Sequence, residues 1–319
     1  MLIKYSDNPF KQVFGIAFYN RKNIFLFTLI SIIAVLQYEF GEIFLWNPII
    51  LPVVPVTILG GALAIFLGFR NNSAYDRWWE ARKIWGGIVN ASRTFGIMVC
   101  TFSSTNFSKG KVKGKEIKAW RKESIHRHIG WLYALIMHLR NHNHWDELEK
   151  YLSEEEIEEI KKMHNKPTQI LRLQSEKIQE AYDKNYIEDF RHMELANVIK
   201  EFYDLQGMAE RIKGTIFPYY YNYFTGVFLW LFVICLPFSL APEMHWGAIP
   251  MSLAISFVFT ILEKSGAITE DPFEGRAADT PINTITRNIE IDLLEMIKSE
   301  TVPAPAEPKI GRFGVKYLD

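Results

Sequence analysis

Hydrophobic and polar positions divide the chain into long uncharged runs separated by charged blocks. Three runs carry no Asp, Glu, Lys or Arg: residues 43–69, 214–242 and 244–262. A helix needs about 20 apolar residues to cross a bilayer. A shorter apolar run begins at residue 23 and is followed by Glu39 and Glu42. We therefore predict four membrane spans, at about 23–41, 49–69, 219–240 and 246–262.

The block between the second and third spans has a different pattern. Residues 109–213 hold 20 Lys+Arg and 19 Asp+Glu, and their apolar residues recur at helical spacing. This pattern predicts amphipathic helices with solvated outer faces rather than strands. We interpret the glutamate-rich run 154–159 as such a face rather than a cation site. The tail 301–319 contains three prolines and is predicted to be extended.

The basic residues predict an orientation. All 36 Lys and Arg lie in residues 1–22, 70–93, 109–213 and 263–319, and the links expected on the opposite side hold only acidic charges. Basic loops stay in the cytoplasm. We expect a multi-pass protein of the inner membrane with both termini cytoplasmic.

The domain boundaries follow from these blocks. We predict a cytoplasmic N-terminal segment (1–22), two spans with a cytoplasmic extension (23–104), a cytoplasmic helical domain (105–213), two further spans (214–265), and a loop, helix and extended tail (266–319).

Composition and motifs argue against other classes of protein. The 36 acidic residues balance the 36 basic ones, whereas a nucleic-acid binder is basic overall. Cys100 and Cys235 cannot form a disulfide framework and are interpreted as small buried hydrophobes. Without a phosphate-binding loop or a nucleophile motif, we predict that the protein is not an enzyme and has no cofactor.

A stretch rich in Arg and Trp follows the second span, in residues 68–93. Its candidate residues are Arg70, Asn71, Arg77, Trp78, Trp79, Glu80 and Arg82. Interfacial anchoring explains much of this composition. The density of charged and amide side chains exceeds what anchoring needs, so we predict a buried polar cluster at the cytoplasmic mouth of a pore.

The second span carries the candidate pore lining. Pro48, Pro52 and Pro55 either kink it or start a new helix near Pro55, whose free N–H groups favour anions. Beyond them, Gly61, Ile65 and Phe69 lie at i, i+4 and i+8 on one helix face. Several copies around an axis would form a narrow apolar constriction.

Two other groups of residues resemble metal sites. Of His126, His128, His138, His142 and His144, the pair His138 and His142 has ligand-like i, i+4 spacing. A flexible polar segment near a helix end explains this cluster better, and no metal is predicted.

The loop after the last span offers Glu270, Asp271, Pro272, Phe273 and Asp279, whose acids suit Ca²⁺. Arg276 among them argues against Ca²⁺, so we interpret the loop as leading into a helix.

Three long stretches resemble the prokaryotic bestrophin family. They are FLGFRNNSAYDRWWEARKIWG, the segment 207–240, and TEDPFEGRAADTPINTITRNIEIDLLEMI, and they occur in order over nearly the whole chain. The resemblance implies an all-α integral membrane protein. Each subunit would contribute four transmembrane helices and a cytoplasmic helical bundle to a homopentamer around one central pore. Its partners would be copies of itself, the lipid bilayer and monovalent ions, with no nucleic acid.

The resemblance also assigns candidate residues. It places the hydrophobic neck of the pore on Gly61, Ile65 and Phe69, where Gly61 replaces the expected bulky residue; Ile58 or Ala62 could contribute instead. It places a second, cytoplasmic aperture near Phe190, with Tyr186 or Ile187 as alternatives. Arg276, at a position of the calcium clasp of animal members, suggests that this chain is not gated by Ca²⁺.

These features together predict a passive channel for chloride and other monovalent anions. An alternative is a channel selective for monovalent cations, which the outer Glu39, Glu42 and Glu243 would favour. A more remote alternative is a membrane-anchored enzyme or scaffold. A transporter would need an internal repeat of its hydropathy pattern, and the two pairs of spans do not resemble each other.

Overall fold

The computed structural model describes residues 2–4, 15, 18, 20–41, 43, 47–108, 113–216, 219–311 and 314–319. Helices make up most of these residues. They are α2 (Arg21–Glu39), α3 (Val53–Phe102), α4 (Gly114–Leu139), α5 (Glu154–Lys161), α6 (Lys166–Asp183), α7 (Asp189–Gly214), α8 (Tyr219–Met244), α9 (Ala248–Thr269) and α10 (Ile282–Met296). Two 3₁₀ turns, Thr105–Ser108 and His245–Gly247, and three short strands complete the elements.

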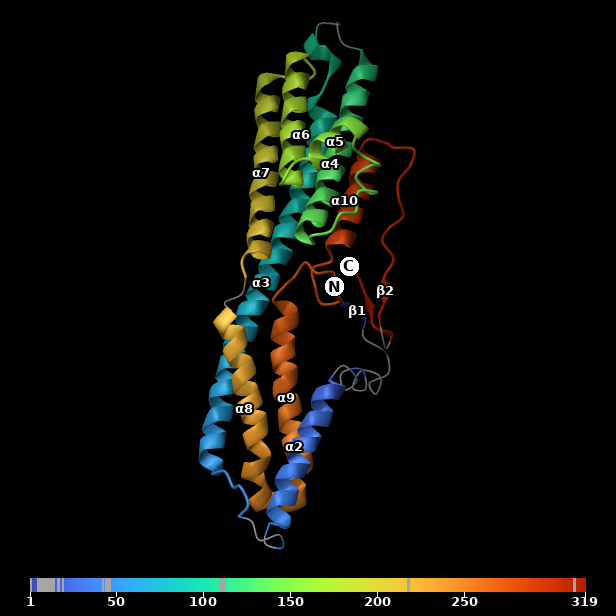
Figure 1. The fold of residues 1–319 in the computed structure, drawn as a ribbon. Coiled ribbons are helices and arrows are strands. Elements are labelled where there is room, and N and C mark those ends of the chain that lie inside the picture. The colour runs from blue at the N-terminus through green and yellow to red at the C-terminus, as the bar shows by residue number, and fades with distance from the viewer. Residues whose placement is uncertain are drawn as a thin grey trace.

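Helix α3 is the spine of the molecule (Figure 1). Its 50 residues extend for about 75 Å at 1.5 Å per residue. The helix begins directly after Pro52, within two residues of the predicted start, and Pro55 lies in its first turn. Proline is tolerated there because the first N–H groups of a helix have no partner within it. After Pro55 no proline interrupts the helix.

The first part of α3, up to Phe69, packs with α8 and α9, and α2 packs against the same two helices; we call these four helix segments the apolar half (Figure 1). Its core includes Phe27, Leu63, Leu67 and Phe232. These four helix segments overlap the four predicted spans, with differences of up to seven residues at their ends. Within the described residues, three stretches are long and apolar enough to cross a membrane: Arg21–Glu39, Val53–Phe102 and Tyr223–Thr269. The third comprises most of α8 and α9, which the 3₁₀ turn joins.

The rest of α3 packs with α4, α7 and α10, and α6 packs against α4 and α7; these helices together with α5 form the polar half. A large core, whose largest fully buried side chains are Trp85 and Trp131, holds these helices together. The predicted amphipathic helices are confirmed. The glutamate-rich run forms α5, where Ser153 and Glu156 make a capping box. Glu156 is not merely solvated, because its Oε1 lies 2.8 Å from Nε of the buried Arg127.

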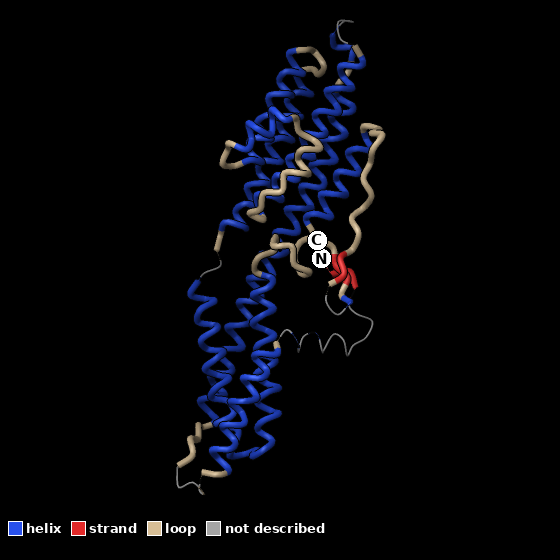
Figure 2. Tube along the Cα trace, turned by 45° about the vertical axis from the view of Figure 1, so that its right-hand side comes forward, coloured by secondary structure: helices blue, strands red, loops and turns tan. Residues whose placement is uncertain are grey.

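The two ends of the chain meet in a small sheet at the level where the halves join (Figure 2). Strand β3 (Lys316–Tyr317) lies between β1 (Leu2–Lys4) and β2 (Lys309–Ile310), and both pairings are antiparallel. The extended tail is confirmed, and so is the predominantly helical fold, to which this small sheet is an addition that was not predicted. Strands of two or three residues are too short to show a period in the sequence.

Candidate functional site

One face of α3 remains uncovered along nearly its whole length. Exposed residues recur every three or four positions, with one step of seven between Lys83 and Asn90, and therefore share one side of the helix. We call this side the open face; it comprises Val54, Ile58, Gly61, Ile65, Phe69, Asn72, Asp76, Trp79, Lys83, Asn90, Thr94, Ile97 and Thr101. The open face is apolar up to Phe69 and mostly polar beyond it.

The three predicted neck residues lie together on this face. Ile65 and Phe69 are 64% and 61% exposed, although each is a large apolar side chain. A Cβ atom added at Gly61 would meet no other atom within 4 Å. The opposite side of the same turns is packed, because Leu63 and Leu67 are buried in the core of the apolar half. Ile58 lies on the open face as well, and Ala62 is exposed beside it.

Arg70 begins the predicted polar cluster, where the two halves join. Its guanidinium is 3% exposed and lies 3.3 Å from Oε1 of Glu263 and 3.4 Å from Oε2 of Glu270. Asn71 donates to the carbonyl of Leu262 at 3.1 Å. A side chain at Gly266 would collide with the Asn71 amide oxygen, so this glycine permits the contact. Both residues therefore fasten α3 to the end of α9.

Arg77 and Trp78 fasten α3 to two other segments. Arg77 donates to the carbonyls of Ile212 and, at 2.6 Å, Thr215, at the end of α7. It also lies 3.8 Å from Asp271. The indole N–H of Trp78 donates to the carbonyl of Ala278 at 2.9 Å.

The remaining residues of the motif lie outside these contacts. Trp79 is exposed on the open face, Glu80 pairs with Lys83 at 2.7 Å, and Arg82 is half-buried. The motif thus divides into a buried clamp, formed by Arg70, Asn71, Arg77 and Trp78, and a more exposed part.

The acidic residues of the post-span loop face basic groups or main-chain N–H donors. Glu270 and Asp271 contact Arg70 and Arg77, as described above, and Glu274 pairs with Lys213. Asp279 is buried and accepts from the amide of Arg276 at 2.9 Å. Burial raises the pKa of Asp279 and outweighs the hydrogen bond from the Arg276 amide, which lowers it. The loop leads into α10, as the sequence predicts.

Phe273 and Pro272 anchor the same loop. Phe273 is buried, and its carbonyl accepts from Nε of Arg140 at 3.0 Å, while the Pro272 carbonyl accepts from the amide of Thr280 at 3.0 Å. The guanidinium of Arg140 also pairs with the buried Asp319, which Lys309 contacts at 2.7 Å. Burial raises the pKa of Asp319, but the hydrogen bonds from Lys309 and Arg140 outweigh it and lower that pKa. The sequence did not reveal this connection between the tail and the loop.

The three candidates for the cytoplasmic aperture differ in burial. Phe190, at the start of α7, is 80% exposed. Tyr186 and Ile187 are both buried in the core of the polar half. Of the three, Phe190 is the one whose side chain projects into open space.

His138 and His142 do not lie on one helix face, although they are spaced at i, i+4 in the sequence. Helix α4 ends at Leu139 and Asn141 has a φ of 52°, so His138 and His142 are not in the same helix. His128 is fully buried, with Nε2 2.9 Å from the Ser92 hydroxyl, and burial lowers its pKa to about 3. The described residues contain no group of three or more His, Cys, Asp or Glu that could hold a metal ion.

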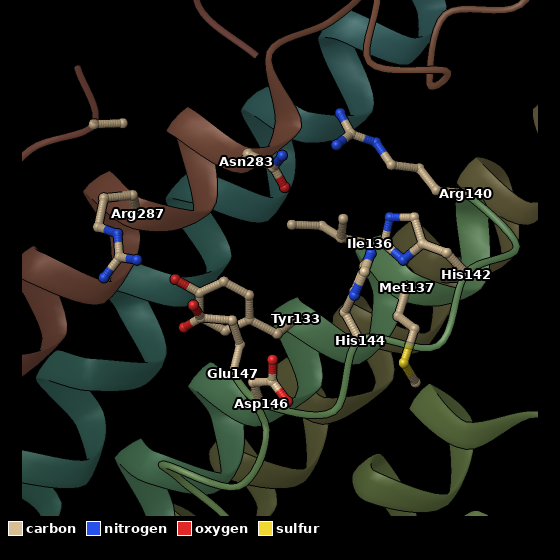
Figure 3. A pocket seen from close by; sticks show the side chains of 11 residues that line it. Tyr133, Ile136, Met137, Arg140, His142, His144, Asp146, Glu147, Asn283 and Arg287 are labelled. Atoms are coloured by element: carbon tan, nitrogen blue, oxygen red, sulfur yellow. The ribbon is translucent and has the colours of Figure 1, made fainter. Parts of the chain in front are cut away.

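A cavity of about 490 Å³ lies between the end of α4, the loop after it and α10 (Figure 3). Tyr133, Arg140, His142, Glu147 and Arg287 are among its lining residues. Beside it, the buried Glu290 accepts from the hydroxyls of Tyr133, at 2.5 Å, and of Tyr151, and it pairs with Arg287. Burial and the hydrogen bond to Glu290 raise the pKa of Tyr133. The hydrogen bond from Tyr133 of α4 to Glu290 of α10 ties these two helices together.

Comparison with known proteins decides the family. The family model for "Bacterial/Fungal Bestrophin protein" matches residues 21–295. The chain belongs to the bestrophin family. The family predicted from the sequence is therefore confirmed, and it is a family of channels rather than enzymes.

Named relatives and a solved structure agree with this family. The chain is 32% identical over 254 residues to the "Voltage-dependent anion channel-forming protein YneE" of Salmonella typhi, covering 80% of each chain. It is 27% identical over 251 residues to the "Voltage-dependent anion channel-forming protein sll1024" of Synechocystis, covering 79% of this chain and 78% of that one. A crystal structure of a bacterial bestrophin homologue from Klebsiella pneumoniae matches with a TM-score of 0.77 and 28% identity, covering 87% of this chain and 98% of that chain.

Proposed function

We propose that this bestrophin is the pore-forming subunit of a passive channel for chloride and other monovalent anions. Five copies would place the open faces of their α3 helices around one axis. The observation that carries this proposal is the open face itself, which exposes Ile58, Ile65 and Phe69 at helical spacing while the opposite side is packed. Anion conduction is supported by the relatives, which are named as anion channel-forming proteins.

The apolar stretch of the open face would form the neck. Rings of Ile65 and Phe69 bind no ion and would control the pore by excluding water when it is narrow. Gly61 adds no side chain, so the neck of this chain would consist of two main rings, with Ile58 available as a third. Phe190 would form the cytoplasmic aperture.

The proposed orientation places the polar half in the cytoplasm of a bacterial cell and the apolar half in the inner membrane. It is supported by the basic residues, which are absent from 23–69 and 214–262. Among the outer acids, Glu39 Oε1 lies 2.8 Å from Nδ1 of His245, and Glu42 lies outside the described residues.

The test is the current through purified protein in a planar bilayer with a KCl gradient. We expect a reversal potential close to the chloride equilibrium potential, and a larger conductance for the double variant Ile65→Ala/Phe69→Ala. A matched control, Phe25→Ala/Ile33→Ala, removes the same exposed side-chain types from α2 and should leave conductance unchanged. A reversal potential close to that of potassium would replace the anion assignment by a cation channel. Equal conductance in both double variants would refute the neck.

A further inference from the structure

The open face carries two charged residues, and they differ in their partners. Lys83 pairs with Glu80 at 2.7 Å, one turn before it on α3. The carboxylate of Asp76 is exposed and forms no hydrogen bond or ion pair with the part of the chain that the structure describes. Its negative charge is therefore not neutralised by a contact within the subunit.

Two arginines close to Asp76 on α3 are engaged elsewhere. Arg77 is adjacent to Asp76, but its guanidinium contacts the end of α7 and Asp271. Arg70 is buried between Glu263 and Glu270. Both guanidinium groups have anionic or carbonyl partners away from the open face, so neither compensates the charge of Asp76.

The position of Asp76 along α3 is well defined. It follows Phe69 by seven residues, which is two turns, or about 10 Å along the helix axis. It therefore lies on the same side as Phe69 and just beyond the last apolar ring of the proposed neck. Asn72 lies between the two on the same face. Every subunit around the axis would contribute one carboxylate at this level.

We propose that Asp76 sets the charge preference at the inner mouth of the neck, where it attracts cations and limits the preference for anions. This inference rests on the proposed function, because it needs the open face to line a pore. An apolar neck distinguishes poorly between ions of opposite charge, so fixed charges at its mouth decide which ions enter. A ring of carboxylates acts over about 8 Å at physiological ionic strength, the distance within which salt leaves a charge largely unscreened.

The test is the ratio of chloride to potassium permeability, measured from the reversal potential under a KCl gradient. Asp76→Asn removes the charge and keeps the shape of the side chain. We expect the ratio to rise at least about threefold near 0.15 M salt, and more near 0.01 M, where the screening length is about 30 Å. An effect that arose from altered packing would not grow as the salt concentration falls.

Three further variants separate charge from structure. Asp76→Glu keeps the charge and should retain the wild-type ratio. Asn72→Asp in the Asp76→Asn background returns a carboxylate to the same face one turn away and should bring the ratio back towards the wild-type value. Glu158→Gln removes an equal charge from the exposed α5 and should leave the ratio unchanged.

The experiments distinguish a failure of this inference from a failure of the proposed function. If wild-type protein passes no current, the channel proposal fails. If it conducts but Asp76→Asn leaves the ratio unchanged, or Glu158→Gln shifts it equally, the assignment of Asp76 is wrong. If Asp76→Asn does not assemble, Asn72→Lys decides the question. That variant keeps Asp76, places a cation beside it and must raise the same ratio.

Discussion

The guanidinium of Arg70 lies 3.3 Å from Oε1 of Glu263, although 193 residues separate them along the chain. Arg70 follows the last apolar residue of the neck stretch on α3, and Glu263 lies near the end of α9. A second carboxylate, Glu270, contacts the same guanidinium at 3.4 Å. This cluster ties the helix that carries the open face to its neighbour at the level where the apolar half ends.

Removing Arg70 should destabilise this junction. We expect Arg70→Gln to cost about 2–3 kcal/mol, below the 3–5 kcal/mol typical of a broken buried pair, because Glu263 is partly exposed. Arg70→Lys should recover only part of this loss, since one ammonium group cannot reproduce the two-pronged guanidinium. The measurement is the thermal unfolding midpoint in detergent. An unchanged midpoint for Arg70→Gln would show that the cluster does not stabilise the fold.

Two adjacent glycines should respond differently to the same substitution. A Cβ at Gly60 would lie 2.7 Å from the ring of Phe232, whereas a Cβ at Gly61 would meet no other atom within 4 Å. Gly61→Ile should therefore fold normally and reduce single-channel conductance by adding an apolar ring to the neck.

Gly60→Ile serves as the matched control for that experiment. It should separate α3 from α8 and lower the yield of assembled protein, because overpacking a core costs typically about 1–3 kcal/mol. Size-exclusion chromatography reports assembly, and bilayer recordings report conductance. A normal conductance for Gly61→Ile would place residue 61 outside the pore.

Phe190→Ala tests the proposed aperture. The side chain is largely exposed, so its loss should hardly change thermal stability while it increases conductance or alters gating. Tyr186→Ala provides the contrast, because Tyr186 is buried and contacts the ring of Trp120. It should lower stability by about 3 kcal/mol, as for other large-to-small changes in a core. If Phe190→Ala lowered stability and left conductance unchanged, Phe190 would not form the aperture.

His128 should make the protein less stable in acid. Its pKa is about 3 in the fold against an ordinary value of 6.5 for histidine, so the unfolded state binds the proton first as the pH falls. The free energy of unfolding should therefore decrease below pH 6.5, with a slope from this group of up to about 1.4 kcal/mol per pH unit.

Replacing this histidine should flatten the pH dependence. We expect His128→Phe to be less stable than wild type at pH 7, through loss of the Ser92 contact, and to lose less stability than wild type between pH 6.5 and pH 4. Thermal unfolding at a series of pH values measures both effects. His164→Gln, at an exposed position, is the control. Parallel curves for wild type and His128→Phe would contradict the prediction.

Patterns of local sequence predicted the helices well. Apolar runs marked the helices of the apolar half, and helical spacing marked α4, α6 and α7. The same spacing placed Ile65 and Phe69 on one side of α3, where the structure leaves them exposed. These features depend on residues a few positions apart, and the sequence contains that information directly.

Contacts between distant segments could not be predicted in this way. The sequence showed that the stretch around Arg77 holds more charge than anchoring requires, but not that carbonyls 135 and 138 residues away would accept its hydrogen bonds. The pair His138 and His142 failed for a local reason, because Asn141 adopts a left-handed conformation and the helix has already ended. The sheet was missed because its strands are so short.

The continuity of α3 gives the protein a mechanical property. A continuous helix of about 75 Å can act as a lever, and a tilt of about 8° about its middle displaces each end by about 5 Å. The clamp of Arg70, Asn71, Arg77 and Trp78 lies near the middle of this rod and is suited to be its fulcrum. A displacement of the polar half would then move the far end of α3, at Val53, in the opposite direction, and would move Ile65 and Phe69, which lie close to the fulcrum, by a smaller amount, without any change within the helix itself.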